Sequence, residues 1–194
     1  MLKIMSQRDM RVLSCIIWDY RKKGVPVIQS GFVTTGEFIA HEYVYVDNAL
    51  FQAQRRSAVA PGDIVMAKIG AQCGTCAILP EGHPVGILAG NSLKISTNSN
   101  YCRTLFLLKV LHCYYQIGLM DKVITETAQP AISLKNLRAM LIPLPSLMEQ
   151  DSIVSNLNFH DSRIRTEEQC RDKLKLQKKG LIHDLLTGKV RVKI

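Results

Sequence analysis

The chain has 194 residues, of which 47% are hydrophobic, so it can bury one core of ordinary size. Its formal net charge of +9 and its pI near 9.4 favour a polyanionic partner or an acidic membrane surface. No run of 18 apolar residues occurs, and Met1-Leu2-Lys3-Ile4 does not begin a secretory signal. The sequence therefore predicts neither a membrane-spanning helix nor a signal peptide.

Short strand patterns separated by turn residues fill the first half of the chain. A hairpin is expected where Asp63–Ile69 and Thr75–Leu79 flank the turn Gly70–Gly74. Three other segments have the apolar pattern of short strands: Pro26–Gln29, Glu42–Val46 and Ser92–Ser96, with Gly31 and Gly36 turning between the first two. These patterns predict a mixed sheet.

Two helices are expected between this sheet region and residue 140. Arg103–Leu119 is apolar on nearly all sides, which predicts a largely buried helix. Ser133 is placed to cap a short helix that runs through Arg138. Together with the strands, these helices indicate an α+β fold.

One long charged helix is predicted at the C-terminal end. Pro143 and Pro145 favour an extended backbone, and Ser146 followed by Glu149 has the spacing of a capping box. Thr187-Gly188 supplies the stop signal, with glycine at the usual position. At 1.5 Å per residue the helix would be about 60 Å long. Its interior Gly180 costs roughly 1 kcal/mol relative to alanine and would allow two backbones to approach closely.

A row of apolar residues follows a three-four spacing along this helix. Its members, which we call the seam, are Ile153, Leu157, Ile164, Leu174, Leu181 and Leu185; the skipped positions are His160, Glu167, Arg171 and Lys178. A helix of this length cannot bury such a row within a small domain, so the pattern predicts a partner helix. The alternative is a solvated surface helix packed on its own domain.

Six cysteines raise the question of a metal or redox site: Cys15, Cys73, Cys76, Cys102, Cys113 and Cys170. Cys73-Gly74-Thr75-Cys76 is a CxxC motif, but a zinc site needs a second close pair, which the sequence lacks. A redox motif would begin a helix, whereas Ala77–Pro80 has a strand pattern. Small buried thiols in a reduced, cytoplasmic protein are the better interpretation.

Two segments around the long helix resemble the specificity subunit of type I restriction–modification enzymes. They are QPAISLKNLRAMLIPLPSLMEQ before the charged part of the helix and GLIHDLLTGKVRV at its end. The upstream blocks GVPVI, PGDIVMAKIG and AILP are similar to recurring blocks of that family in order and spacing. The resemblance covers Gly24 to Val192.

The chain departs from that family in two respects. Family subunits normally carry two recognition domains and two spacer helices, whereas this chain has one of each. Its opening, Met1–Tyr20, lacks the expected Trp-plus-Gly-Asp strand, although Trp18 lies nearby. The open explanations are a natural half-length subunit, a truncated gene and a shortened recombinant chain, and the complete C-terminal helix favours the first.

The resemblance implies a DNA recognition subunit with two parts. Residues 1–145 would be a target-recognition domain that reads one half of a bipartite site in double-stranded DNA. Residues 146–194 would be a spacer helix that acts as a ruler and docks adenine methyltransferase subunits, to which restriction subunits attach. A half-length chain restores the family arrangement by forming a homodimer, with the helices as an antiparallel coiled coil. The expected location is the cytoplasm of a bacterium or archaeon, without membrane attachment.

Residue type and position suggest which side chains contact DNA. Base edges attract Arg, Lys, Gln, Asn and Ser at the ends of elements, and phosphates attract Lys and Arg. The candidates are Arg21, Lys22, Lys23, Gln29, Ser30, Arg55, Arg56, Lys68, Gln72 and Lys94. The Arg21–Lys23 and Arg55–Arg56 groups are the leading ones.

No catalytic motif is present in the sequence. An Asn-Pro-Pro-aromatic motif, a glycine-rich turn for a methyl donor and a GxxxxGK[ST] loop are all absent, so no cofactor or metal is expected. Asp63 and Lys68 only faintly resemble a nuclease site, since an aspartate in a Pro-Gly-Asp turn bonds its own backbone. The rival functions are a small nuclease or methyltransferase, a protein-only coiled-coil adaptor, and a specificity module of a different restriction–methylation enzyme.

Overall fold

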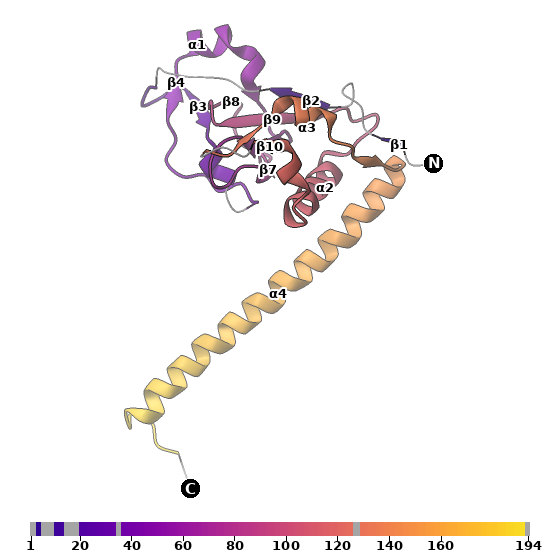
Figure 1. Ribbon diagram of the computed structural model, residues 1–194. Helices are drawn as coiled ribbons and strands as arrows, with labels where there is room; N and C mark the ends of the chain where they lie inside the picture. Colours follow the sequence, from indigo (N-terminus) through magenta and orange to yellow (C-terminus); the bar gives the residue numbers. More distant parts are fainter. Residues whose placement is uncertain (1–2, 5–9, 14–19, 34–35, 126–128, 193–194) are drawn as a thin grey trace. The chain divides into compact units, whose positions relative to one another are not determined.

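The computed structural model describes residues 3–4, 10–13, 20–33, 36–125 and 129–192. Its chain divides into two compact units, Met1–Asp151 and Ser152–Ile194 (Figure 1). The first unit is globular and contains two four-stranded sheets and two short strand pairs. The second unit consists mostly of one helix. Cys15 and Trp18 lie outside the described residues.

An antiparallel sheet of four strands forms one layer of the globular unit. Its strands, in spatial order, are β2 (Met10–Leu13), β9 (Ser92–Thr97), β6 (Ile64–Ala67) and β7 (Cys76–Ile78). Strands β6 and β7 form the expected hairpin, with Val65 opposite Ala77. The strand expected at Ser92–Ser96 is confirmed as β9.

A mixed sheet of four strands forms the second layer. Its order is β4 (Tyr45–Val46), β3 (Val25–Ile28), β8 (Gly86–Leu88) and β5 (Ala58–Val59), and only the β3–β8 pair is parallel. Gly86 makes that parallel pair possible, because a Cβ atom there would lie 2.8 Å from the Pro26 carbonyl oxygen. The strand expected at Pro26–Gln29 is confirmed as β3, one residue earlier, and the strand expected at Glu42–Val46 is confirmed in shortened form as β4.

The mixed sheet has a hydrophobic cluster on each of its two faces. On the face toward the antiparallel sheet, Ile28, Val59 and Leu88 pack with Val65 and Leu79. On the opposite face, Val27, Val46 and Ile87 pack against partly buried residues that include Leu50 and Phe51 of α1 (Asn48–Ala53). The short helix α1 therefore covers part of the outer face of the mixed sheet.

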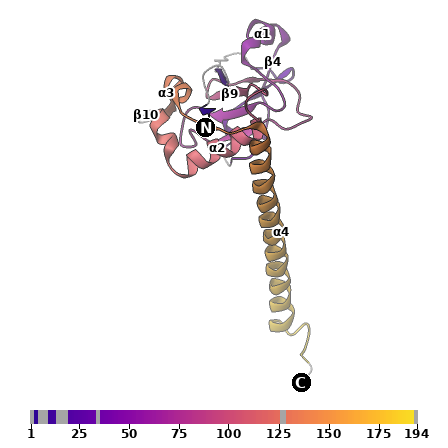
Figure 2. The ribbon, with the colours of Figure 1, turned by 90° about the vertical axis from the view of Figure 1, so that its right-hand side faces the viewer.

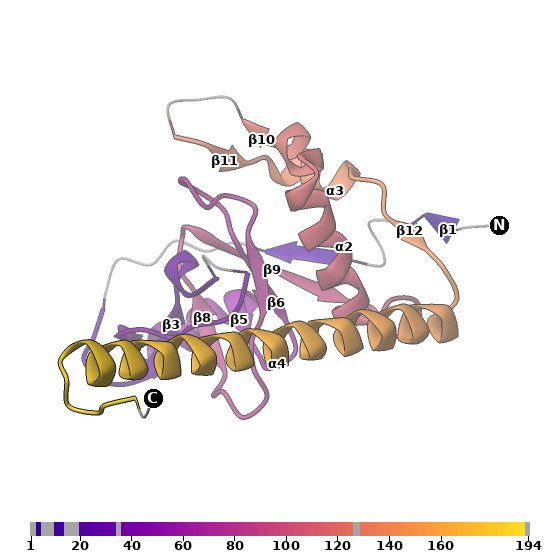
Figure 3. The ribbon, with the colours of Figure 1, turned by 90° about the horizontal axis from the view of Figure 1, so that it is seen from below.

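The remaining elements of the globular unit are short, except for α2 (Thr104–Gln116). They are η1 (Ser30–Val33), η2 (Arg55–Ser57), η3 (Leu119–Val123), α3 (Leu134–Ala139), the antiparallel pair β10 (Ile124–Thr125) and β11 (Ala131–Ile132), and the antiparallel pair β1 (Lys3–Ile4) and β12 (Pro143–Leu144). In Figure 2, helix α1 and β4 lie at the top of this unit, and α3 and β10 lie at its left side. The β10–β11 hairpin is seen beside α2 and α3 in Figure 3.

Two expectations about these helices have different outcomes. Ser133 caps α3 as predicted, because its Oγ accepts a hydrogen bond from the Asn136 amide. The expectation that the Arg103–Leu119 helix is largely buried is wrong. Of α2, only Phe106, Leu107 and Leu111 are buried, whereas Leu105 and Tyr115 are exposed. Only one face of α2 packs against a sheet, and the rest of the helix is not buried.

The predicted C-terminal helix is confirmed as α4 (Leu147–Leu186). Ser146 accepts a hydrogen bond from the Glu149 amide at 3.3 Å, as an N-cap residue should. Gly188, with a φ of 73°, follows the last turn in the left-handed conformation that glycine adopts easily. The α+β class is therefore confirmed, and pairing of α4 as a coiled coil stays a prediction. No helix in the described part of the chain is long and apolar enough to span a membrane.

Candidate nucleic-acid interface

The first basic group, Arg21–Lys23, lies in an exposed turn that is attached to the edge strand β4. The Arg21 amide donates to the Tyr45 carbonyl at 2.6 Å, and the Tyr45 amide donates back to Arg21 at 3.1 Å. Gly24 completes the turn with a φ of 138°, and a Cβ atom there would lie 2.1 Å from the Val46 carbonyl oxygen. Only glycine permits this close approach, which fixes the turn beside the start of α1.

The second basic group, Arg55–Arg56, lies in η2 directly after α1 and is also exposed. At the other end of α1, Asp47 caps the helix by accepting a hydrogen bond from the Leu50 amide at 2.7 Å. Its second oxygen lies 4.0 Å from the Arg21 guanidinium. The six residues of α1 place about 9 Å of helix between its two ends, at 1.5 Å per residue.

The structure thus brings the two leading groups to opposite ends of one short helix. We call Arg21, Lys22, Lys23, Arg55 and Arg56 the α1 basic cluster. Leu50 and Phe51 hold the underside of α1 against the core, so the cluster is carried by packed elements rather than by a free loop. Because both groups lie on the same end of the unit, five cations can act on one polyanion.

A second set of candidates lies at the opposite ends of the strands. Gln29 and Ser30 follow β3. The four residues of that strand, at about 3.3 Å each, place them roughly 13 Å from the strand end that lies next to Lys23. Lys68 follows β6, and its amide donates to the Asn91 carbonyl at 2.8 Å. Gln72 is exposed in the β6–β7 turn, where the Gly70 amide donates to the Pro130 carbonyl at 2.9 Å. These four residues therefore form a second group, separate from the α1 basic cluster.

Lys94 is directed into the protein and is not placed with either group. Its ammonium donates to the Ala58 carbonyl at 2.5 Å and lies 3.5 Å from Asp63, and its side chain is only 15% exposed. Asp63 also accepts hydrogen bonds from the Ala60 amide and from the Ser96 hydroxyl, at 3.0 and 2.7 Å. Both side chains serve a partly buried ion pair, so we leave Lys94 out of the proposed DNA contacts. Asp63 bonds its own turn, as expected from the sequence.

The CxxC motif has the surroundings of structural cysteines. Cys76 is the first residue of β7 and is buried. Burial raises the pKa of its thiol to about 12, so the thiol stays protonated at neutral pH. The Cys73 thiol donates to the Lys68 carbonyl at 3.1 Å within the hairpin turn. Within the described residues, no three His, Cys, Asp or Glu side chains are grouped so as to hold a metal ion.

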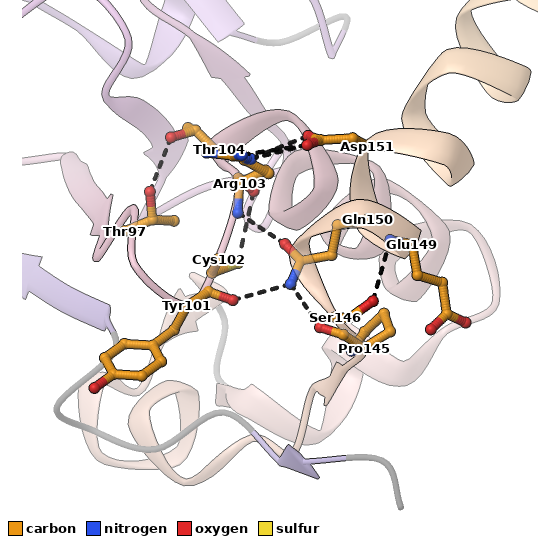
Figure 4. A network of polar contacts seen from close by, with 10 residues as sticks. All are labelled: Thr97, Tyr101, Cys102, Arg103, Thr104, Pro145, Ser146, Glu149, Gln150 and Asp151. Atoms are coloured by element: carbon orange, nitrogen blue, oxygen red, sulfur yellow. Dashed lines mark hydrogen bonds and ion pairs between the residues drawn. The ribbon is translucent and has the colours of Figure 1, made fainter.

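A polar network at the start of α4 was not anticipated from the sequence (Figure 4). Gln150 is fully buried, and its amide nitrogen donates to the carbonyls of Tyr101 and Pro145, each at 2.9 Å. Its amide oxygen accepts a hydrogen bond from the Arg103 amide at 2.8 Å. The neighbouring Asp151 accepts from the Arg103 guanidinium at 3.0 and 3.2 Å. The compact globular unit ends at Asp151 and so includes the first turn of α4, and the functional boundary at residue 145 stays a prediction.

Five of the six seam residues of α4 are exposed in the single chain, and Ile153 is half-buried. The exposed fractions are 41% for Leu157, 56% for Ile164, 59% for Leu174, 61% for Leu181 and 41% for Leu185. Large side chains in such a regular row are usually covered by a partner. The row therefore keeps the partner-helix interpretation, and no partner is shown here.

Comparison with a family model identifies a match over most of the chain. The family described as "Type I restriction modification DNA specificity domain" matches residues 17–176. Among curated proteins, two relatives from Methanocaldococcus jannaschii are similar. The type I restriction enzyme MjaVIII specificity subunit is 34% identical over 88 residues, which are 45% of this chain and 21% of the relative. The putative type I restriction enzyme MjaX specificity subunit is 29% identical over 170 residues, 86% of this chain and 40% of the relative.

Solved structures show the same fold at low sequence identity. A chain from a study of complex assembly and conformational transition in a type I R-M system matches with a TM-score of 0.71 and 16% identity, covering 93% of this chain and 43% of that one. The HsdS subunit from Thermoanaerobacter tengcongensis matches with a TM-score of 0.66 and 16% identity, and the match covers 94% of this chain and 44% of that subunit. This chain therefore spans less than half the length of the relatives that it matches.

Proposed function

This chain belongs to the family of type I restriction modification DNA specificity domains, and from that premise we propose that its globular unit reads one half of a bipartite target in double-stranded DNA. The α1 basic cluster is the observation that supports this proposal most directly. Its five cations are exposed and have Asp47 as the neighbouring acid at one end of α1. Cations of this kind fix the register of a protein on the phosphate backbone.

The spacing of the cluster suits a DNA groove. The two basic groups flank about 9 Å of helix, which is of the same order as the ~12 Å width of the major groove. Phosphates on the two sides of a groove would then meet one group each. In this arrangement Gln29, Ser30, Lys68 and Gln72 form a second polar surface, and they are the remaining candidates for base contacts.

We assign α4 two roles within the same proposal. Its exposed seam, Leu157, Ile164, Leu174, Leu181 and Leu185, would pair with the same helix of a second copy, giving a homodimer with two recognition units. The paired helices would fix the distance between the two half-sites. They would also dock DNA adenine methyltransferase subunits, through which restriction subunits join. In this proposal the chain directs chemistry that other subunits perform.

Binding to DNA tests the role of the α1 basic cluster. The variant Arg55→Gln/Arg56→Gln should bind a pool of random-sequence duplexes at least tenfold more weakly at 100 mM salt. Each lost phosphate contact should also reduce the slope of log K against log salt by about 0.9. Fluorescence anisotropy across a salt series measures both quantities.

The matched control removes two exposed lysines from a different side of the unit. Lys122→Gln/Lys135→Gln changes the net charge by the same amount, with substitutions in η3 and α3. This variant should retain most of the affinity and slope. Equal losses in the two double variants would show that only total charge matters, and would contradict the proposed contact surface. A wild-type chain that does not bind DNA would favour the protein-only adaptor instead.

A further inference from the structure

The polar residues that interrupt the α4 seam form a pattern of their own. Glu167 and Arg171 lie one turn apart at the middle of the seam, with His160 and Lys178 further out on either side. Two shallow hollows follow the same face of the helix. The first is lined by His160, Arg163, Ile164, Glu167, Glu168 and Arg171, and the second by Glu167, Cys170, Arg171, Leu174, Lys175 and Lys178. All four interrupting residues therefore line the surface that a partner helix would fill.

We infer that α4 pairs with the α4 of a second copy in one antiparallel register, with the two-fold axis at the level of Gln169. This inference rests on the homodimer proposed above and specifies its contacts. In an antiparallel pair, a residue that lies a given number of positions before the axis faces the partner residue that lies the same number of positions after the axis. Glu167 then faces the partner's Arg171, and the symmetry repeats this ion pair on the other side of the axis.

The same register matches every apolar seam residue with another. Ile164 faces the partner's Leu174, and Leu157 faces the partner's Leu181. Further out, Ile153 faces the partner's Leu185. Only His160, opposite the partner's Lys178, makes an unfavourable pair, and this pair lies away from the centre, where water can reach both side chains.

Slipping the register by one heptad breaks part of this matching. In one direction Arg171 faces the partner's Leu174, and Leu157 lies opposite the partner's Gly188, beyond the end of the helix. In the other direction Ile164 faces the partner's Glu167, and Ile153 faces the partner's Lys178. A charge opposite an apolar side chain loses hydration without gaining a partner, so both slipped registers are disfavoured.

Residues that flank the seam agree with the central register in part. Asp161 lies beside the partner's Lys175, which is favourable. Glu168 lies beside the partner's Glu168, which is unfavourable. Each Glu168 carboxylate lies 4.0 Å from Arg171 of its own helix, and this positive charge offsets the repulsion. The flanking charges therefore add little, and the seam residues decide the register.

Cys170 provides a native probe of the axis position. It precedes Arg171, one of the residues that interrupt the seam, and is exposed in the single chain. Because it lies one position from Gln169, the two copies of Cys170 would be about 3 Å apart along the helix axis. A short bismaleimide should therefore join the two thiols of a dimer.

Thiol cross-linking tests this placement directly. The full chain carrying Cys15→Ser and Cys113→Ser keeps Cys170 as its exposed thiol in the described residues. We expect most of the dimer to become covalent, and none after Cys170→Ser is added. A chain that is dimeric by light scattering but is not joined through Cys170 would overturn the register while leaving the homodimer intact. A monomeric wild-type chain would overturn the homodimer and the register together.

Charge reversal at the centre gives a second, independent test. Glu167→Arg alone, or Arg171→Glu alone, places like charges opposite each other twice per dimer and should weaken dimerisation at least tenfold. Mixing the two single variants should restore a heterodimer, because both central pairs then join opposite charges. Lys173→Glu, an exposed position off the seam, is the control and should leave dimerisation unchanged. Failure of the mixture to recover affinity, with wild type dimeric, would contradict the inferred register.

Discussion

Gln150 shows how a single buried side chain can join two elements. An amide group carries two donors and an acceptor with two lone pairs, and Gln150 uses both ends of its amide in three hydrogen bonds. Its partners are backbone groups of the Tyr101–Arg103 segment and of Pro145. The first turn of α4 is thus held to these two segments by hydrogen bonds of a fully buried side chain. A shorter residue at this position would leave all three partners unsatisfied.

Replacing Gln150 by alanine should therefore destabilise the globular unit. Each buried backbone group left without a partner costs about 1–3 kcal/mol, so we expect a loss of roughly 3 kcal/mol in the free energy of unfolding. The six tyrosines all precede residue 152, so intrinsic fluorescence during urea unfolding follows this unit. Gln169→Ala, at an exposed position of α4, is the matched control and should change little. Equal stability of the two variants would show that the network contributes nothing.

At the scale of elements, local sequence signals predict structure well where the cause is local. The β6–β7 hairpin follows from its glycine-rich turn, and the caps at Ser133 and Ser146 follow from short polar side chains before helices. The beginning and end of α4 were likewise predicted from Pro145 and Gly188. In each case the deciding interaction spans only a few residues.

The remaining features depend on contacts between distant segments. The apolar pattern of α2 does not show which face meets the sheet, and the helix leaves Leu105 and Ile117 exposed. The two halves of the α1 basic cluster are about 30 residues apart in sequence, and the pairing of Arg21 with Tyr45 and of β3 with β4 brings them to one helix. Lys94 was a reasonable DNA candidate by residue type, and only the position of Asp63 shows that its charge is used internally.

The exposed seam of α4 leads to a prediction at the same scale. Leu174→Asp/Leu181→Asp should convert a dimer into a monomer, because two charges per chain would be buried without partners in the paired helices. Sedimentation or light scattering across a concentration series measures the effect. The control, Phe159→Asp/Leu176→Asp, replaces two exposed apolar residues on the other side of the helix and should leave the dimer intact. A seam variant that is still dimeric at micromolar concentration would contradict the proposed seam.

At the scale of the whole molecule, the symmetry of the proposed homodimer would connect the helix to the proposed DNA target. A dimer of identical chains presents the same recognition surface twice, related by a two-fold axis. Such a protein reads an inverted repeat, and the distance between its halves is set by the paired helices. A slip of one heptad would change the separation of the two helix starts by about 10 Å, equal to roughly three base pairs. The register inferred from Glu167 and Arg171 would therefore determine a spacing in DNA.

Selection from random duplexes by the wild-type chain should accordingly recover an inverted repeat split by a spacer of constant length. Changing the spacer by three base pairs should lower the affinity at least tenfold, since only one half-site could then be read in register. The monomeric seam variant should recover a single half-site without a preferred spacer, and with lower affinity because the second contact is lost. Recovery of the same split repeat by that monomer would mean that α4 does not set the spacing. Recovery of a single unsplit site by a wild-type dimer would mean that the two units do not act on one DNA molecule.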